Sequence, residues 1–348
     1  MGTPQYQLSP RFYPPHIQPQ SKENLPQRNK KRNTIRKSCI RYQCNSFSEV
    51  IFIKQLSTDT VFGIVGGDLR QAALAKSLDR DGYPVKAFLL ENLLPPCLVC
   101  RDIGALQSCD IVIFPLPISK DGNGEQINAP MSSSALCLSE CLKYCRSDAF
   151  LFGGKISPTE EQLAHLFGHH LIDYLKQEEM AVLNAVPTAE GAVGIALSER
   201  ASTLWESRCL ITGFGRCAKT LALLLKGFGA KITIAARNPG ELAFARTLGF
   251  STVALDRISD ILPCQDIIFN TVPSLIFGEE LLTKISDEAL IIDLASCPGG
   301  IDFQAASRLG KKSIWALSLP GKVAPVTAGN IIRDTVLSAV SSILSSKS

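Results

Sequence analysis

The sequence predicts an α/β protein made of two doubly wound, parallel-sheet domains with a cleft between them. Short apolar strands alternate with helices along most of the chain, which is typical of a parallel sheet covered by helices. Many of these strands end in segments rich in Gly and Pro. Residues 209–237 have the order strand, glycine turn, helix, strand. The length of 348 residues allows two domains.

The first domain is expected at residues 59–187. Its five apolar strands are predicted at 61–65, 85–89, 110–114, 149–152 and 171–174. Its helices are predicted at 70–81, 132–146 and 158–167. Gly82 ends the first helix, and Pro158 suits the first turn of the third. Pro187 is predicted to open an interdomain helix at 188–207.

The second domain is expected at residues 208–327. Its strands are predicted at 209–212, 231–236, 266–270, 289–293 and 313–317. A helix at 219–228 follows the glycine turn, and Gly229 ends it. Residues 328–348 are expected to form a C-terminal helix that packs back toward the first domain. Ligands of such sheets bind outside the carboxyl ends of the strands, so the Gly/Pro-rich segments should border one cleft.

The glycine turn predicts a dinucleotide site. Gly213, Gly215 and Ala218 stand at G-x-G-x-x-A spacing, with Phe214 and Arg216 inside the turn. The first glycine permits a tight turn, and the second lets the backbone approach a pyrophosphate. The small third residue packs helix against strand. The full strand-turn-helix-strand context strengthens the motif. The alternative is a glycine turn in another kind of parallel α/β unit.

Arg237 indicates NADP rather than NAD. NAD-binding folds usually place a carboxylate at the tip of the second strand to hold the ribose 2′-hydroxyl. Here that tip carries Arg237, whose guanidinium suits a 2′-phosphate. The alternative is a solvated charge at a strand end. Thr271 and Pro273, after the strand at 266–270, are expected to line the same cofactor.

Residues 1–58 differ in composition from the rest of the chain. Residues 1–60 hold ten Lys or Arg and three acidic residues, although the whole chain has a net charge of only +4. We expect a disordered segment. A basic interaction arm, a targeting peptide and a leader added by a wrong start codon are the alternatives, and we favour the last. The remainder is slightly acidic, so no nucleic-acid surface is expected. No apolar run reaches the length of a membrane span.

Several strand ends could hold an anionic substrate. Gly66 and Gly67 lack a third spaced glycine, so we expect an anion pocket made by their N–H groups and Arg70. A plain strand-to-helix turn is equally compatible with these residues. Lys155 is a further candidate contact. Ser296 and the amides of Gly299 and Gly300 are candidates on the other side.

Two carboxylates are candidate bases. Glu190 is expected in the first turn of the interdomain helix, where the helix dipole alone also favours an acidic residue. Asp293 ends the strand at 289–293 and is the second candidate. Dehydrogenases of 2-hydroxy acids share this two-domain organisation but use a histidine near the last strand. Residues 314–329 contain no histidine, which disfavours a simple oxidation of a hydroxyl to a ketone.

No metal site is expected. Cys97 and Cys100, with Cys109 nearby, lack a second pair at zinc-finger spacing. His165 and the pair His169–His170 are close in sequence, but Gly168 should break their helix, and no third ligand is evident. The cysteines are expected to be mostly reduced and buried.

From about residue 61 to residue 344 the chain resembles the A subunit of dipicolinate synthase from endospore-forming bacteria. Each of the motifs is modest evidence alone, but their order and spacing along the chain are specific to this family. The segments that carry the resemblance are 66–71, 187–191, 213–216, 270–274, 293–300 with Asp302–Phe303, and 319–329.

The resemblance implies a first domain like that of formate and glycerate dehydrogenases and an NADP-binding Rossmann domain. It also implies an oxidoreductase that converts dihydrodipicolinate, or its hydrated precursor from the lysine route, to pyridine-2,6-dicarboxylate during sporulation. The family works with a flavoprotein-like B subunit in the cytoplasm of the mother cell. The alternatives are a non-catalytic scaffold that binds NADP or substrate for the B subunit, and another two-domain NAD(P) dehydrogenase. Whether the protein forms homo-oligomers stays open.

Overall fold

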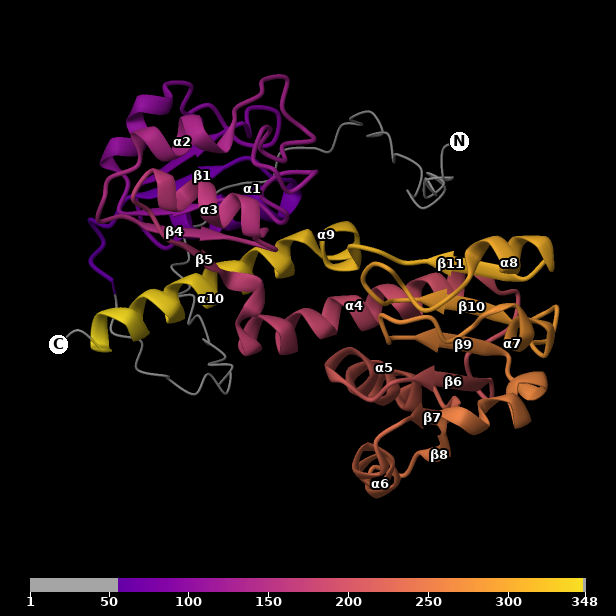
Figure 1. Cartoon of the computed structure of the whole chain (residues 1–348). Coiled ribbons are helices and arrows are strands. Elements are labelled where there is room, and N and C mark those ends of the chain that lie inside the picture. Colours follow the sequence, from indigo (N-terminus) through magenta and orange to yellow (C-terminus); the bar gives the residue numbers. More distant parts are fainter. Residues whose placement is uncertain (1–55, 347–348) are drawn as a thin grey trace, which may run out of the picture. The chain divides into compact units, whose positions relative to one another are not determined.

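A computed structural model describes residues 56–346 of the chain. The expectations for residues 1–58, a disordered tail or a leader, fall almost entirely outside the described residues. Two sheets make up the described part, and every strand pair in both is parallel. Helices cover both sheets (Figure 1). The predicted fold class is therefore confirmed.

The N-terminal sheet has five strands in the order β2-β1-β3-β4-β5. Its strands are β1 (Phe62–Val65), β2 (Val85–Phe88), β3 (Ile111–Ile113), β4 (Phe150–Gly153) and β5 (Leu171–Asp173). Its helices are α1 (Leu69–Arg80), α2 (Leu138–Tyr144) and α3 (Pro158–Leu166). All five predicted strands are present, but α2 is about half as long as predicted. The strand order reverses between β1 and β3, which is where a ligand binds in such sheets.

The second sheet has six strands in the order β11-β10-β9-β6-β7-β8. They are β6 (Arg208–Thr212), β7 (Lys231–Ala236), β8 (Ser251–Ala254), β9 (Ile267–Asn270), β10 (Leu290–Asp293) and β11 (Lys312–Trp315). Its helices include α5 (Arg216–Gly227), α6 (Pro239–Thr247), α7 (Glu279–Thr283) and α8 (Phe303–Arg308). This is the strand order of the Rossmann fold, with its switch point between β6 and β9. β8 and the three short helices after α5 were not predicted.

Helix α4 (Glu178–Glu199) corrects the predicted interdomain helix. It begins nine residues before Pro187, which lies inside it, and it ends well before residue 207. Met180 on its first turn belongs to the core of the N-terminal sheet. Ala189, Ala192 and Val193 belong to the core of the six-stranded sheet. One helix therefore contributes residues to the cores of both sheets.

The last helix, α10 (Pro325–Ser346), packs on the N-terminal sheet beside α1. Ile332, Val336 and Val340 are buried in the same core as Leu74 and Leu78 of α1. An ideal Cβ on Gly329 would lie 2.5 Å from the Arg70 carbonyl oxygen, so only glycine permits this close helix contact. The short helix α9 (Leu319–Val323) joins β11 to α10, at a strand end where only a Gly/Pro-rich segment was expected.

Helix α4 also qualifies the expectation about membranes. Within the described residues it is long and apolar enough to cross a bilayer by length and composition alone. Less than half of its apolar window is buried. A core helix of a soluble protein passes the same test, and α4 supplies both cores, so the test gives only weak evidence for a membrane span.

Candidate active site

Gly213 and Gly215 shape the turn between β6 and α5 in different ways. Gly213 has a φ of +86°, and its N–H donates to the Ala235 carbonyl at 2.8 Å. A Cβ there would lie 2.6 Å from Thr271 Oγ1, so this position requires glycine for both reasons. Gly215 has an extended backbone, and a Cβ there would meet nothing within 4 Å. The space beside Gly215 is open, as close approach of a pyrophosphate requires.

The first turn of α5 faces this open space. Within residues 56–346, no side chain caps this helix end, so its N–H groups are free to bind an anion. Ala218 is fully buried, and it packs the helix onto the sheet as the motif predicts. Phe214 is also buried, edge-on against Phe244 and Phe250. Because its side chain is packed in the core, only the backbone of Phe214 is placed to contact a cofactor.

Other predicted cofactor residues surround the turn. Thr271 follows β9, and its hydroxyl donates to the Thr212 carbonyl at 2.8 Å. Pro273 is exposed two residues later. Arg216 forms an ion pair of 2.6 Å with Glu178 at the start of α4, and both side chains are largely exposed. The structure therefore brings α5, β9 and the start of α4 together around Gly215.

Arg237 lies one residue beyond β7, at the position predicted for a 2′-phosphate contact. Its side chain is exposed, and no ion pair or hydrogen bond joins it to another residue in the described part of the chain. Asn238 caps α6 by accepting a hydrogen bond from the Gly240 N–H at 2.8 Å. The guanidinium is thus held on a capped turn with its donors free.

A buried chain of hydrogen bonds crosses the carboxyl ends of β6, β9 and β10. The Thr212 hydroxyl donates to Asn270 Oδ1 at 2.6 Å, and Asn270 Nδ2 donates to Asp293 Oδ1 at 2.7 Å. Asp293 also accepts from the N–H groups of Ala295 at 3.0 Å and Gly300 at 2.8 Å. With no exposed surface and three donors aimed at it, Asp293 organises the loop after β10. Asp293 is therefore a weaker candidate base than Glu190, whose side chain is exposed.

The glycine pair after Asp293 also departs from the expectation. The Gly299 N–H donates to the Ser296 carbonyl at 2.8 Å, and the Gly300 N–H is used by Asp293. These amides are therefore not available to a substrate carboxylate. The side chain of Ser296 is exposed, so its hydroxyl is the candidate that this loop retains.

The amides of Gly66 and Gly67 are occupied in the same way. The Gly66 N–H donates to the Phe88 carbonyl at 2.9 Å, and the Gly67 N–H donates to the Asn128 carbonyl at 2.7 Å. Both glycines have positive φ angles, +63° and +99°. The pair makes the sharp turn into α1, as a plain strand-to-helix turn would. The expected anion pocket of N–H groups is not present, which leaves Arg70 as the charged candidate.

Arg70 is held rigidly after this turn. Its Nε and Nη2 donate to the two carboxylate oxygens of Asp68 at 2.9 and 2.8 Å, and Nη2 also donates to the Leu116 carbonyl at 3.1 Å. Burial by itself lowers the pKa of Arg70, but the hydrogen bond and the charge of Asp68 raise it above its ordinary value. Among the described residues Nη1 has no partner, so it is free to bind an anion.

Residues 319–321 lie against Arg70. An ideal Cβ on Gly321 would be 2.9 Å from Arg70 Nε, so glycine admits the guanidinium at this point. Gly191 of α4 approaches Leu319 in turn, with its ideal Cβ 3.2 Å away. The structure thereby brings together three motifs that are far apart in sequence: the turn before α1, the middle of α4 and the segment after β11.

Lys155 and Glu190 are both exposed. Lys155 follows β4 with a φ of +55°, and its N–H donates to Asp173 at 3.2 Å. Glu190 lies more than three turns into α4, so the dipole at the helix start does not explain it. This corrects its predicted position. It precedes Gly191, which contacts the segment beside Arg70, and it remains a candidate base.

Sequence reasoning did not identify the polar support behind Arg70. Gln71 is fully buried against Gly67, and no hydrogen bond to its Oε1 is found in the described structure. The Tyr174 hydroxyl donates to the Phe114 carbonyl at 3.2 Å, and burial raises its pKa well above the ordinary range. Gln71 lies in segment 66–71, one of those that carry the family resemblance. That membership was the signal in the sequence that could have identified it.

Three thiols with zinc-finger-like spacing and a surface hollow lie away from this site. Cys97, Cys100 and Cys109 are free thiols, and burial raises the pKa of Cys109 to about 11. A hollow of about 530 Å³ lies at the amino ends of β6, β9, β10 and β11, with Arg208 and Lys312 among its residues. Ligands of this fold bind at the opposite, carboxyl edge. We therefore do not assign this hollow to the cofactor.

Comparison with known proteins supports the resemblance seen in the motifs. Residues 61–175 match the family described as the N-terminal domain of the dipicolinate synthase A subunit. The chain is 28% identical over 283 residues to the dipicolinate synthase A subunit of Bacillus subtilis (strain 168), covering 80% of this chain and 95% of that protein. The resemblance to this family is thus confirmed.

Solved structures agree on the fold. The A chain of dipicolinate synthase from Bacillus subtilis matches with a TM-score of 0.74 and 26% identity, covering 82% of this chain and 97% of that chain. The dipicolinate synthase A subunit from Bacillus halodurans matches with a TM-score of 0.75 and 24% identity, covering 81% and 97%. An L-alanine dehydrogenase matches with a TM-score of 0.55 and 14% identity, covering 81% and 90%. The fold is therefore that of the dipicolinate synthase A chains, and an L-alanine dehydrogenase shares it.

Proposed function

We propose that this chain is the A subunit of a dipicolinate synthase and that it oxidises dihydrodipicolinate, or its hydrated precursor, to pyridine-2,6-dicarboxylate with NADP. The observation that carries the proposal is the open turn at Gly215 at the start of an uncapped α5, on a chain similar to that subunit over most of its length. Aromatisation of a dihydropyridine releases a hydride and a proton. Bound at the turn after β6, NADP would supply the hydride acceptor, and a side chain of the chain would take the proton. The hydrated precursor would in addition have to lose a molecule of water.

We assign the binding of the substrate carboxylates and the uptake of the proton to different residues of the site. Arg70 Nη1 binds one substrate carboxylate, because the rest of its guanidinium is fixed by Asp68 and Leu116. The Ser296 hydroxyl and the Lys155 ammonium are candidates for the other carboxylate. Glu190 is the candidate base, since Asp293 is enclosed by its three donors. Oxidation of a planar dicarboxylate requires only that the substrate is oriented and that one modest base accepts a proton. The absence of a histidine from residues 314–329 is therefore compatible with this reaction.

Replacement of Arg70 by Ala is expected to raise the KM for the dicarboxylate at least about tenfold, because a charge-assisted hydrogen bond contributes about 1.5–3 kcal/mol. Binding of NADP should stay unchanged. Steady-state kinetics and cofactor titration measure both. Arg333→Ala is the matched control, since it also breaks an ion pair, between α10 and Asp81 at the end of α1. An unchanged KM would remove Arg70 from the site.

The cofactor preference depends on Arg237. Arg237→Ala is expected to weaken NADP binding about tenfold or more and to leave NAD binding within about twofold, because only NADP carries the 2′-phosphate. Titration of nicotinamide fluorescence with NADPH and NADH measures this. Arg257→Ala, which changes another exposed arginine of the same domain, is the control. Equal losses for both cofactors would show that Arg237 is a solvated charge.

One experiment tests the reaction itself. Freshly prepared dihydrodipicolinate and NADP are added to the purified chain, with and without the flavoprotein-like B subunit, and NADPH is followed by absorbance. Reduction by the chain alone supports the proposal. Reduction only when the B subunit is present favours the scaffold alternative, in which this chain binds NADP or substrate for its partner. No reduction in either mixture contradicts the assigned reaction and favours another two-domain NAD(P) dehydrogenase.

The partner and the compartment follow from the same proposal. The relatives are named as subunits, so the protein should act in a complex with a flavoprotein-like B subunit. We place it in the cytoplasm of the mother cell of a sporulating bacterium. A homo-oligomeric form would be seen by light scattering of the purified chain.

A further inference from the structure

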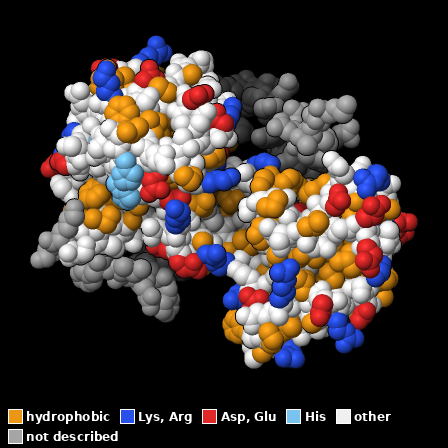
Figure 2. Space-filling model, viewed as in Figure 1, with side chains coloured by type: hydrophobic (Ala, Val, Ile, Leu, Met, Phe, Trp, Pro, Cys, Tyr) orange, Lys and Arg blue, Asp and Glu red, His pale blue; other side chains and the backbone are white. Residues whose placement is uncertain are grey.

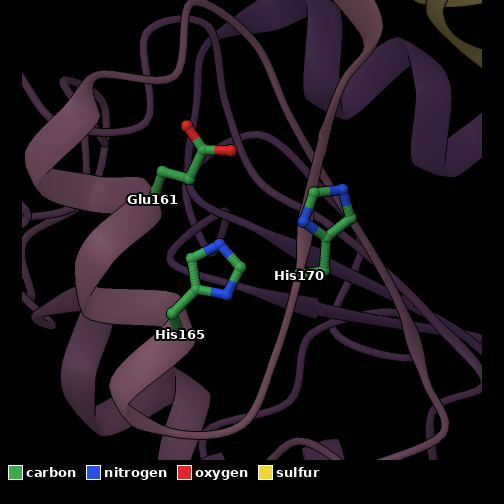
Figure 3. Close-up of side chains that lie close together, drawn as sticks. All are labelled: Glu161, His165 and His170. Carbon is green, nitrogen blue, oxygen red and sulfur yellow. The ribbon is translucent and has the colours of Figure 1, made fainter.

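Three exposed side chains with metal-binding groups converge at the end of α3. Glu161 and His165 lie four residues apart on α3, and His170 lies on the segment just before β5. One ligand atom from each lies within 4.8 Å of the other two. Figure 3 shows the carboxylate and the two imidazole rings around a common space. Figure 2 shows histidine side chains as one exposed patch on the surface.

The backbone fixes this arrangement. Gly168, at φ +77°, ends α3 and reverses the chain, and the His169 N–H donates to the Ala164 carbonyl at 2.9 Å. His169 is buried, and its Nε2 lies 3.0 Å from the Leu142 carbonyl, which anchors the segment from below. Gly168 was expected to keep the histidines apart by ending the helix. Instead, the chain reversal at Gly168 brings His170 back beside α3. The objection that no third ligand exists also fails, because Glu161 supplies it.

We propose that Glu161, His165 and His170 bind a zinc ion. Two imidazoles and one carboxylate are a recurrent zinc ligand set, with a further position open to water. Bonds of about 2.0–2.2 Å to tetrahedral zinc place ligand atoms roughly 3.4 Å apart. Rotation of the three exposed side chains would bring their ligand atoms from the observed separation of up to 4.8 Å to this distance. The ion joins α3 to the chain entering β5.

The zinc site is separate from the cofactor and substrate site. His170 precedes β5, so it lies at the amino edge of the N-terminal sheet. Arg70 and Lys155 follow strands β1 and β4, so they lie at the carboxyl edge. All three ligand side chains are exposed, so the open zinc position faces solvent. Zinc binding is therefore independent of the oxidation proposed above.

Titration of the full-length protein with Zn²⁺ by calorimetry, and with Co²⁺ by visible absorption, tests the proposal. One equivalent is expected to bind, with cobalt bands that lack sulfur-to-metal charge transfer. His165→Gln, His170→Gln and Glu161→Gln should each raise the dissociation constant at least about tenfold. They should also remove the rise in melting temperature that zinc gives the unchanged protein.

Glu288→Gln is the matched control, because Glu288 is an exposed carboxylate of the other sheet, and this variant should bind zinc like the unchanged protein. Unchanged affinity in both histidine variants would overturn the proposal. Cobalt bound only with sulfur charge-transfer bands would also overturn it, since the cysteines would then be the ligands. Circular dichroism of each variant checks that the fold is kept.

Discussion

Gly215→Val is expected to reduce NADP binding at least about 100-fold, because the second glycine of the turn is where the backbone must approach the pyrophosphate. The fold should tolerate the change. Gly215 has an extended backbone that any residue adopts, and a Cβ there meets nothing within 4 Å. The loss of glycine at the helix start should cost about 1 kcal/mol. Cofactor titration and thermal unfolding measure the two effects separately.

Gly227→Ala, at the other end of the same helix, is the control for Gly215→Val. A Cβ there also meets nothing within 4 Å, so NADP should bind as before and stability should rise slightly. Gly213→Ala is the opposite case. Gly213 has a positive φ, and an added Cβ would collide with Thr271, so this substitution should destabilise the protein itself. If Gly215→Val bound NADP normally, the assignment of the cofactor to this turn would be wrong.

Asp293→Ala should lower the free energy of unfolding by about 3–5 kcal/mol, because it leaves a buried amide of Asn270 and two backbone N–H groups without their acceptor. The expected fall in melting temperature is roughly 10 °C. Asp293→Asn should also destabilise, since every partner of this side chain is a donor and the amide would present an NH₂ group to one of them.

Asp302→Ala is the control from the same motif. Asp302 accepts a hydrogen bond from the Ala305 N–H at the start of α8, and removal of such a cap costs about 1 kcal/mol. Chemical denaturation of the three variants should therefore rank both Asp293 variants well below Asp302→Ala. If Asp293→Asn kept its stability but lost turnover, Asp293 would have to be reconsidered as the base.

The local patterns of this sequence were sufficient for most of the fold. Runs such as those at β1, β6 and β10 are buried on both faces, so they read as short, uninterrupted apolar strands. The turn at Gly213 was predictable because a positive φ and a tight contact both demand glycine. The start of α4 was missed because Pro187 is tolerated inside the helix, although proline usually marks a first turn.

The candidate site shows where such patterns stop being sufficient. Glycine pairs after strands indicated free amides, but the amides at Gly66, Gly67, Gly299 and Gly300 are all bonded within the protein. Whether an N–H is free depends on carbonyls and carboxylates from other strands, such as those of Phe88 and Asp293. Sequence spacing carries no information about these partners.

By itself, the sequence determined the two parallel sheets, the glycine turn after β6 and the arginine after β7, because each depends on residues that are neighbours in the chain. Only the tertiary structure decided which polar groups are free to act. It enclosed Asp293, left the hydroxyl of Ser296 and the Nη1 of Arg70 available, and brought Gly321 against Arg70. It also folded His170 back onto α3. Burial and hydrogen-bond satisfaction arise from contacts between distant segments, and those contacts exist only once the sheets have formed.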